Sequence, residues 1–439
     1  MSNTRLALRA SGLLGLAVVS ASGAAVAWTP LPVDLDPLVR MPGNQESDGI
    51  LIEASSNCMG CHAGYQADVE PGFNWQGSMM SNAMRDPIFW ATVTVAAQDS
   101  IWAAGRPNAT DICLRCHSPA GWLGGHSDPT NGSAMTGADF DGISCDFCHS
   151  SYDPFFEDTA AGLREGSDWL GYWDETNNSS TPSNTAAATT LAADRSAASG
   201  TRMFNGSTMF VANRPRIGTW SEAGSGQYFV STSKNRRASF ADAVPKHQLF
   251  YSRFHKSKHF CGTCHDVSNP VLANLAHKNA TPGDGTTVLP TEQSPASALS
   301  HVERTQSEFM LSAYGLAGGS EGVGPYAPGV FKTSRPGNKI AACQDCHMAD
   351  TTGAAANKNS AVLRPTDSVE HPKSGLPKHD MQGGNLIVPR LLASTVQTSP
   401  NYDATNATLL RQGPGLLTLD LTQGLALNPA ALLAAADRS

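Results

Sequence analysis

The cysteines of this chain fall into one repeated pattern that can do chemistry. All ten of them belong to five C-x-x-C-H motifs, and none is left over. The two thiols of such a motif can form thioether bonds to a porphyrin, and the histidine that follows can bind its iron. The pattern therefore predicts five covalently attached c-type haems. The predicted attachment residues are Cys58, Cys61, Cys113, Cys116, Cys145, Cys148, Cys261, Cys264, Cys343 and Cys346, and the predicted proximal iron ligands are His62, His117, His149, His265 and His347.

Three other uses of paired cysteines explain the pattern less well. A zinc site would take two C-x-x-C pairs for each metal, so five pairs would leave one unmatched. A thioredoxin-like dithiol needs a single pair in a βαβ context. A disulfide framework would not need a histidine after every second cysteine. We therefore favour haem attachment over zinc binding or disulfide formation.

Each predicted iron has a sixth position that a second side chain can fill. The motifs use five of the thirteen histidines, and the other eight are enough for five bis-histidine haems. A histidine close to its own motif would reach a neighbouring haem rather than its own. The candidate distal ligands are His379, His259, His255, His247 and His301. A surface or hydrogen-bonding role is favoured for His126, His277 and His371, and ordinary packing rather than iron ligation is favoured for Met79 and Met80.

The N-terminus has the composition of a secretory signal peptide, which we place at Met1 to Ala27. It has a basic start, a short apolar run from Leu13 to Val19 and a small-residue cleavage site. An uncleaved anchor is the alternative, but the apolar run is short for a membrane span. No later segment has eighteen uninterrupted apolar residues, so we expect no integral membrane segment after cleavage. Because haem c is attached on the export side of the membrane, we expect the protein in a bacterial periplasm, secreted or at the outer surface.

Charge and composition narrow the classes of partner and fold. The net charge is −8, and removal of a signal peptide that carries two arginines would make it more negative. Binding to nucleic acid is therefore disfavoured, whereas a basic redox partner would suit the charge. The 41 glycines and 27 prolines indicate many loops. We expect a mainly α fold with extensive irregular loops, organised around stacked haems that replace much of an ordinary core.

Local patterns predict several elements. Asp86 can cap a helix that runs to Gly105, and a second helix is expected over about 302–314. Short helices are expected at each C-x-x-C-H motif, and another after Asn428. The alternation of Leu417, Leu419 and Leu421 predicts a short β element near the C-terminus. We expect a pentahaem domain over 28–392 with a flexible insert at 174–201, followed by a tail at 393–439.

Several sequence words outside the C-x-x-C-H cores carry a resemblance to a known group. They are G-S-M-M-S-N-A-M-R-D-P from Gly77, G-I-S-C-D-F-C-H from Gly142, F-C-G-T-C-H-D-V-S-N-P from Phe260, C-Q-D-C-H-M from Cys343 and H-D-M-Q-G-G-N from His379. Over roughly residues 45–390 the chain resembles bacterial multihaem cytochromes c of the hydroxylamine-oxidoreductase-like and cytochrome c nitrite-reductase-like superfamily. The resemblance implies closely packed haems that conduct electrons, and it implies a distal ligand at His379.

The chain also departs from these relatives. No motif replaces its histidine with lysine, as the nitrite reductases do at their active haem, and the chain has five motifs rather than eight. No tyrosine can be assigned as the crosslink of hydroxylamine oxidoreductase. Longer relatives continue into a β-rich region, so the tail at 393–439 can be read as the start of a truncated further region.

Two classes of function fit these observations. The favoured one is an electron carrier that passes electrons along five haems between respiratory partners, such as a quinol-linked donor and other cytochromes. The alternative is a multihaem oxidoreductase in which one haem keeps an open face and acts on a small nitrogen or sulfur compound. A third reading is a subunit of an extracellular filament, and an oligomer is compatible with each of them.

Overall fold

A computed structural model describes residues 31–36, 39, 43–151, 226–240, 242–269, 300–316, 318–333, 335–365, 375–411 and 419–439, with a few isolated positions between 192 and 215. The signal peptide expected at Met1 to Ala27 lies outside these residues, as do nearly all of the insert at 174–201 and both His277 and His371. Within the described residues, no helix is both long and apolar enough to cross a membrane.

Short helices predominate over short strands, in line with the mainly α expectation. The α-helices are α1 (Ser56–His62), α2 (Pro71–Gly77), α3 (Pro87–Ala104), α4 (Asp111–His117), α5 (Pro119–Leu123), α6 (Cys145–Ser150), α8 (Lys258–Gly262), α10 (Thr305–Leu311), α11 (Cys343–His347), α12 (Ile387–Ala393), α13 (Ala404–Leu409) and α14 (Pro429–Arg438). Single turns of 3-10 helix lie between them, among them η2 (Glu46–Asp48) and η7 (Arg253–Lys256).

The strands form two-stranded pairs rather than one sheet. They are β1 (Phe210–Val211), β2 (Arg214–Pro215), β3 (Arg236–Ala238), β4 (Leu249–Tyr251), β5 (Val267–Asn269), β6 (Ser300–Glu303), β7 (Ser320–Glu321), β8 (Lys339–Ile340), β9 (Asp350–Thr351) and β10 (Leu376–Pro377). Strand β3 pairs with β4 in parallel, and the other pairs, β1–β2, β5–β6, β7–β8 and β9–β10, are antiparallel.

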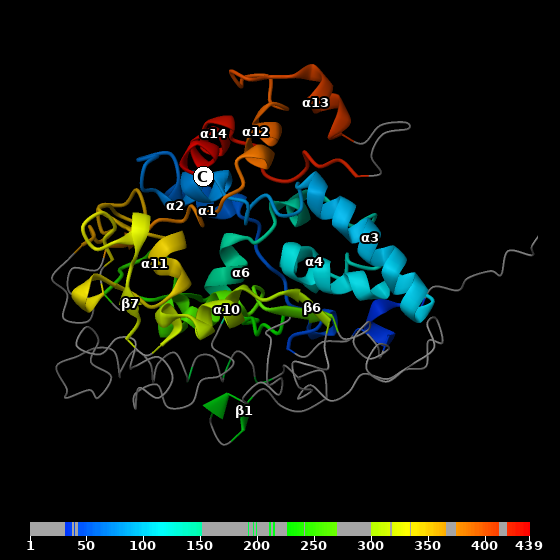
Figure 1. Ribbon diagram of the computed structural model, residues 1–439, viewed down its shortest axis with the longest axis horizontal. Helices are drawn as coiled ribbons and strands as arrows, with labels where there is room; N and C mark the ends of the chain where they lie inside the picture. The colour runs from blue at the N-terminus through cyan, green and yellow to red at the C-terminus, as the bar shows by residue number, and fades with distance from the viewer. Residues whose placement is uncertain are drawn as a thin grey trace, which may run out of the picture. The chain divides into compact units, whose positions relative to one another are not determined.

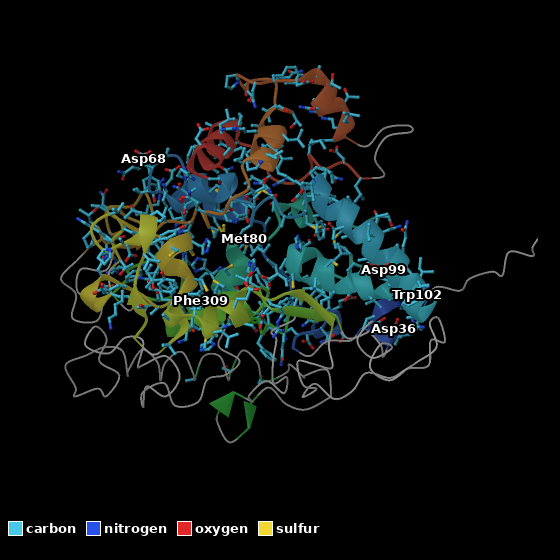
Figure 2. All side chains as sticks on the ribbon, viewed as in Figure 1. Asp36, Asp68, Met80, Asp99, Trp102 and Phe309 are labelled. Atoms are coloured by element: carbon cyan, nitrogen blue, oxygen red, sulfur yellow. The ribbon has the colours of Figure 1, made fainter. Side chains whose placement is uncertain are left out.

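The helix predicted from Asp86 to Gly105 is confirmed as α3. The Asp86 side chain accepts a hydrogen bond of 2.8 Å from the Ile88 N–H, and Gly105 ends the helix with a φ of +75°. Phe89 and Val93 face the core. The outer face carries Trp102, which Figure 2 labels beside Asp99 and which is 66% exposed.

One helix is shorter than predicted, and one predicted strand is not formed by the residues described. The helix expected over about 302–314 begins only at Thr305, because Ser300–Glu303 pair with β5 as strand β6. Leu419 and Leu421 lie in bends and turns rather than in a strand, and the Leu421 N–H donates to the Leu410 carbonyl. Both leucines are buried, so their alternation reflects packing into the core rather than β pairing.

The largest apolar cluster joins the first half of the described chain to the C-terminal helices. Helix α14 lies beside α12 and α2, as Figure 1 shows. Its start fits the prediction, since the Asn428 side chain accepts from the Ala431 N–H at 3.2 Å and Pro429 follows. The buried members of the cluster include Met84, Phe89, Leu114, Trp122, Phe140, Phe147, Tyr228, Val388, Leu392, Leu421 and Leu432.

A close approach fixes α14 against α2. A Cβ placed on Gly77 would collide with the carbonyl group of Ala431 and lie 3.1 Å from the Ala435 Cβ. Glycine at this position therefore lets the two helix backbones meet.

We expect Gly77→Ala to destabilise the fold by about 1–3 kcal/mol, because the added methyl group overpacks the contact between α2 and α14. Denaturant unfolding of the haem-loaded protein measures this change. Gly329→Ala is the control, since nothing lies within 4 Å of its added Cβ. Equal stability of the two variants would contradict the proposed close contact.

Candidate metal centres

Each motif places its cysteines and histidine on one side of a helical turn. Residues at i, i+3 and i+4 share a helix face, so the two thiols and the imidazole of C-x-x-C-H converge. Helices α1, α4, α6 and α11 each contain a whole motif, as predicted. The fourth motif differs, because α8 ends at Gly262. Its chain stays wound, since the N–H groups of Cys264 and His265 donate to the Cys261 carbonyl at 3.1 and 2.9 Å.

Three motif imidazoles are held by main-chain carbonyl groups. The Nδ1 atoms of His62, His149 and His347 lie 2.6, 2.6 and 2.5 Å from the carbonyl oxygens of Ala355, Arg237 and Gln382, respectively. A carbonyl oxygen can only accept, so each Nδ1 carries the proton and donates it. The Nε2 lone pair is then free to bind a metal, which is the usual arrangement of a metal-bound histidine.

Burial keeps several motif imidazoles neutral. It lowers the pKa of His62 and of His149, and it lowers the pKa of His117 to about 4. Because the neutral imidazole is the form that binds a metal, these histidines are ready to act as ligands at neutral pH.

Histidine 379 is brought next to a motif imidazole. Its ring centre lies 6.2 Å from that of His149, with an angle of 23° between the ring planes. Its Nδ1 lies 2.9 Å from the Pro377 carbonyl oxygen and donates to it, so its Nε2 is also free. Burial lowers the pKa of His379 to about 4. Two imidazoles whose nitrogens each lie about 2.0 Å from one shared metal would have ring centres roughly 6 Å apart.

Two other candidates also lie near motif imidazoles. The His247 ring centre is 6.4 Å from that of His62, with the planes at 45°. The His255 ring centre is 5.7 Å from that of His149, and burial lowers the pKa of His255 to about 3. However, the His255 Nε2 lies 2.7 Å from the Cys148 carbonyl oxygen, so this nitrogen carries a proton and donates.

The remaining candidates have other surroundings. His259 Nδ1 lies 3.3 Å from Gln306 Nε2, and the side chain of His301, a residue of β6, lies outside the description. His126 is 44% exposed and its Nδ1 lies 2.7 Å from Asp139 Oδ2. Met79 and Met80 pack against the apolar cluster (Figure 2 labels Met80).

The cysteines of different motifs meet in pairs, which sequence reasoning missed. Contact with Cys58 raises the pKa of Cys145 well above its usual range. Contact with Cys264 does the same to Cys116, and contact with Cys343 does the same to Cys261. The first motif therefore lies beside the third, the second beside the fourth, and the fourth beside the fifth. No local signal reports these pairs, because their members are separated by 82 residues or more.

Burial opposes the reactivity of three motif thiols, whereas contact with Cys145 lowers the pKa of Cys58 and contact with Cys261 lowers that of Cys343. Burial raises the pKa of Cys113 and of Cys148 to about 12, and the pKa of Cys346 to about 11. A reactive cysteine needs the opposite shift. Among the described residues, no group of three or more His, Cys, Asp or Glu side chains could hold a metal ion. A haem needs no such group, because it brings four equatorial nitrogens of its own.

Several buried polar atoms beside the motifs fit a large group bound between them. In the described part of the chain, the structure gives no hydrogen-bond partner to either amide atom of Gln227, to His255 Nδ1 or to Gln344 Oε1. Gln227 is fully buried and follows Gly226, whose added Cβ would lie 3.2 Å from Cys116 Sγ. An unpaired buried polar group costs about 1–3 kcal/mol, so such groups point to a partner in the loaded protein. The residues present therefore fit haem.

A match to known proteins agrees with this chemistry. Residues 57–150, which hold the first three motifs, match a family model described as cytochrome c554 and c-prime. The match supports a c-type cytochrome, a class that implies covalently bound haem c and haem-based electron transfer. Comparison with curated proteins and with solved structures gave no match.

A pair of carboxyl groups, of which Asp111 is buried and Glu46 half-buried, adjoins the second motif. The Ser127 hydroxyl lies 2.8 Å from Asp111 Oδ1 and 3.2 Å from Glu46 Oε1, and the Trp122 N–H donates to Asp111 at 2.9 Å. A hydroxyl has one hydrogen, so all these contacts are satisfied only when one carboxyl group is protonated. Burial raises the pKa of Glu46 to about 7 and that of Asp111 to about 6.

We expect the contribution of Glu46 to the stability of the protein to fall as the pH rises from about 4.5 towards 7. The folded protein binds the Glu46 proton more tightly than the unfolded chain, in which the pKa of this carboxyl group is 4.5. The stabilisation from this proton is therefore complete below pH 4.5 and is lost as the pH rises through about 7. Denaturant midpoints at pH 5 and pH 7.5 should differ less in Glu46→Gln than in the wild type. The control is Glu308→Gln, because Glu308 is exposed. A pH dependence of stability that is the same in Glu46→Gln as in the wild type would contradict the raised pKa of Glu46.

Proposed function

We propose that this chain is an exported pentahaem cytochrome c that passes electrons along its haems between respiratory partners. The observation that carries the proposal is the pairing of cysteines from different C-x-x-C-H motifs. Bound haem iron supplies one-electron redox chemistry, and the protein holds the groups in contact. Export through the segment Met1 to Ala27 and a periplasmic location belong to the same proposal, since haem c is attached on the export side. The net charge of −8 would suit a basic redox partner.

The cysteine pairs support a spatial order for the five proposed haems. A thioether sulfur is bonded to the porphyrin edge, so two sulfurs in contact bring two porphyrin edges close together. The pairs Cys58–Cys145, Cys116–Cys264 and Cys261–Cys343 thus connect the first group with the third, the second with the fourth, and the fourth with the fifth. Cys148 also contributes to the raised pKa of Cys261, which supports contact between the third and fourth. All five proposed haems would then form one connected path for electrons.

The imidazole pairs support the axial ligands at two of these groups. We assign His149 and His379 to one iron and His62 and His247 to another, because their ring separations of 6.2 and 6.4 Å suit two nitrogens bound to one metal. Two imidazole ligands give low reduction potentials, which suits an electron carrier. His259, His255 and His301 stay predictions as distal ligands of the other groups.

The proposed number of haems is tested by the intact mass of the mature protein. We expect the mass of five covalently bound haems, and four in the double variant Cys343→Ala/Cys346→Ala. Ferric electron paramagnetic resonance of the wild type should show only low-spin iron. A strong high-spin signal together with carbon monoxide binding to the reduced wild type would favour the alternative, an enzyme with an open haem.

We expect His379→Ala to convert one haem of the five to high-spin iron that binds carbon monoxide, because it removes the sixth ligand opposite His149. The ferric resonance spectrum and the carbon monoxide difference spectrum measure this change. His126→Ala is the matched control, since His126 is paired with Asp139 at the surface and should leave every haem low-spin. A low-spin spectrum in His379→Ala would remove this residue from the ligand set.

A further inference from the structure

A short turn connects the surroundings of two irons. It comprises His379 to Gln382, and we call it the ligand turn. At its start, His379 lies beside His149 of the third motif. At its end, the Gln382 carbonyl accepts from Nδ1 of His347 in the fifth motif at 2.5 Å, and the Gln382 N–H donates to the His347 carbonyl at 3.1 Å. A shift of this turn would therefore disturb one candidate ligand and the anchor of another.

The turn does not hold its shape by local preference. Met381 has a φ of +37°, in a region that residues other than glycine rarely adopt. Glycine follows only at Gly383, outside the turn. Such a conformation persists when the surrounding contacts impose it. The contacts that could do so come from the last helix of the described chain.

Helix α14 contacts the ligand turn at two points. The Arg438 Nε lies 3.4 Å from Oδ2 of Asp380, whose side chain is only 6% exposed, and Lys378 Nζ lies 3.6 Å from the same oxygen. In addition, the Gln382 side-chain amide donates to the Arg438 carbonyl oxygen. One residue of α14 thus contacts the turn through both its guanidinium group and its main chain.

The helix that carries Arg438 is itself fixed. It packs on α2 and α12, with Leu432 fully buried and Ala431 against Gly77. In Figure 1 the three helices lie together beside the C-terminus. The helix can therefore act as a rigid support for Arg438, whereas Lys378 belongs to the same segment as the turn and cannot anchor it to another part of the fold.

We propose that Asp380 and Arg438 are positioning residues that hold the ligand turn, so that His379 can bind the iron opposite His149 and Gln382 can orient His347. The first half rests on the proposed function, because it requires His379 to be a distal ligand. The second half requires only that His347 binds iron. A buried carboxylate that loses one of its two cationic partners is poorly compensated, so the turn would move towards solvent. A small displacement of Nε2 is enough to break a metal bond of about 2.0 Å.

The test uses haem-loaded protein with Arg438→Ala and Asp380→Asn. We expect a high-spin ferric signal from one haem and carbon monoxide binding in both variants. A more positive reduction potential is also expected for the haem of the fifth motif, because a weaker hydrogen bond from Nδ1 makes His347 a less basic ligand. Arg438→Lys retains a cation near Asp380 and should recover most of the low-spin signal. Haem content and circular dichroism show whether each variant is folded.

The neighbouring ion pair between α12 and α14 provides a matched control. Arg390 Nη2 lies 3.0 Å from Asp437 Oδ1, with the two side chains 49% and 71% exposed, and neither residue belongs to the ligand turn. Arg390→Ala should therefore leave the spin state and the potential unchanged. The positioning role is overturned if Arg438→Ala and Asp380→Asn also leave both unchanged, or if Arg390→Ala changes them equally.

Comparison with His379→Ala separates this proposal from the one on which it rests. High-spin iron in His379→Ala but not in the Asp380 and Arg438 variants would keep the ligand assignment and overturn the positioning role. Low-spin iron in His379→Ala would overturn the ligand assignment and the first half of the inference. The potential of the fifth haem would then decide the second half by itself.

Discussion

The hydrogen bond from an imidazole Nδ1 to a main-chain carbonyl is the interaction on which the candidate sites of His62, His149 and His347 depend. It sets the tautomer, turns the ring and leaves Nε2 for a metal. The acceptors lie far along the chain from the donors, since Ala355 serves His62 and Arg237 serves His149. A C-x-x-C-H motif can therefore form its own helical turn, but the orientation of its histidine depends on the fold of a distant segment.

This dependence explains how much of the structure could be predicted from the sequence. Capping residues act within one turn of chain, so α3 after Asp86 and α14 after Asn428 were accessible to local patterns. Strand β6 was not, because Ser300, His301 and Glu303 acquire their conformation from pairing with β5. The attachment and proximal residues follow from spacing alone and stay predictions. The cysteine pairs between motifs and the placement of His379 beside His149 arise only from tertiary packing.

Buried ion pairs fix the late part of the chain to the early part. Arg85 and Asp141 are both about 3% exposed and lie 2.8 Å apart. Arg85 also donates to the carbonyl oxygens of Gln423 and Leu425, and the Leu425 N–H donates to Asp141. Removing one partner of such a pair would leave an uncompensated buried charge, so the pair specifies where the segment before α14 must lie. The location of α14, and with it Arg438, thus depends on residues near the first motifs.

Proximity alone does not distinguish the two imidazoles next to His149, but their hydrogen bonds do. His255 is the nearer by ring centre, at 5.7 Å against 6.2 Å for His379. Yet the His255 Nε2 donates to the Cys148 carbonyl, whereas the His379 Nε2 is free because Nδ1 makes the bond to Pro377. A nitrogen that carries a proton has no lone pair for a metal. The His255 Nε2 is therefore suited to hold the third motif against η7, whereas the His379 Nε2 is free to bind a metal.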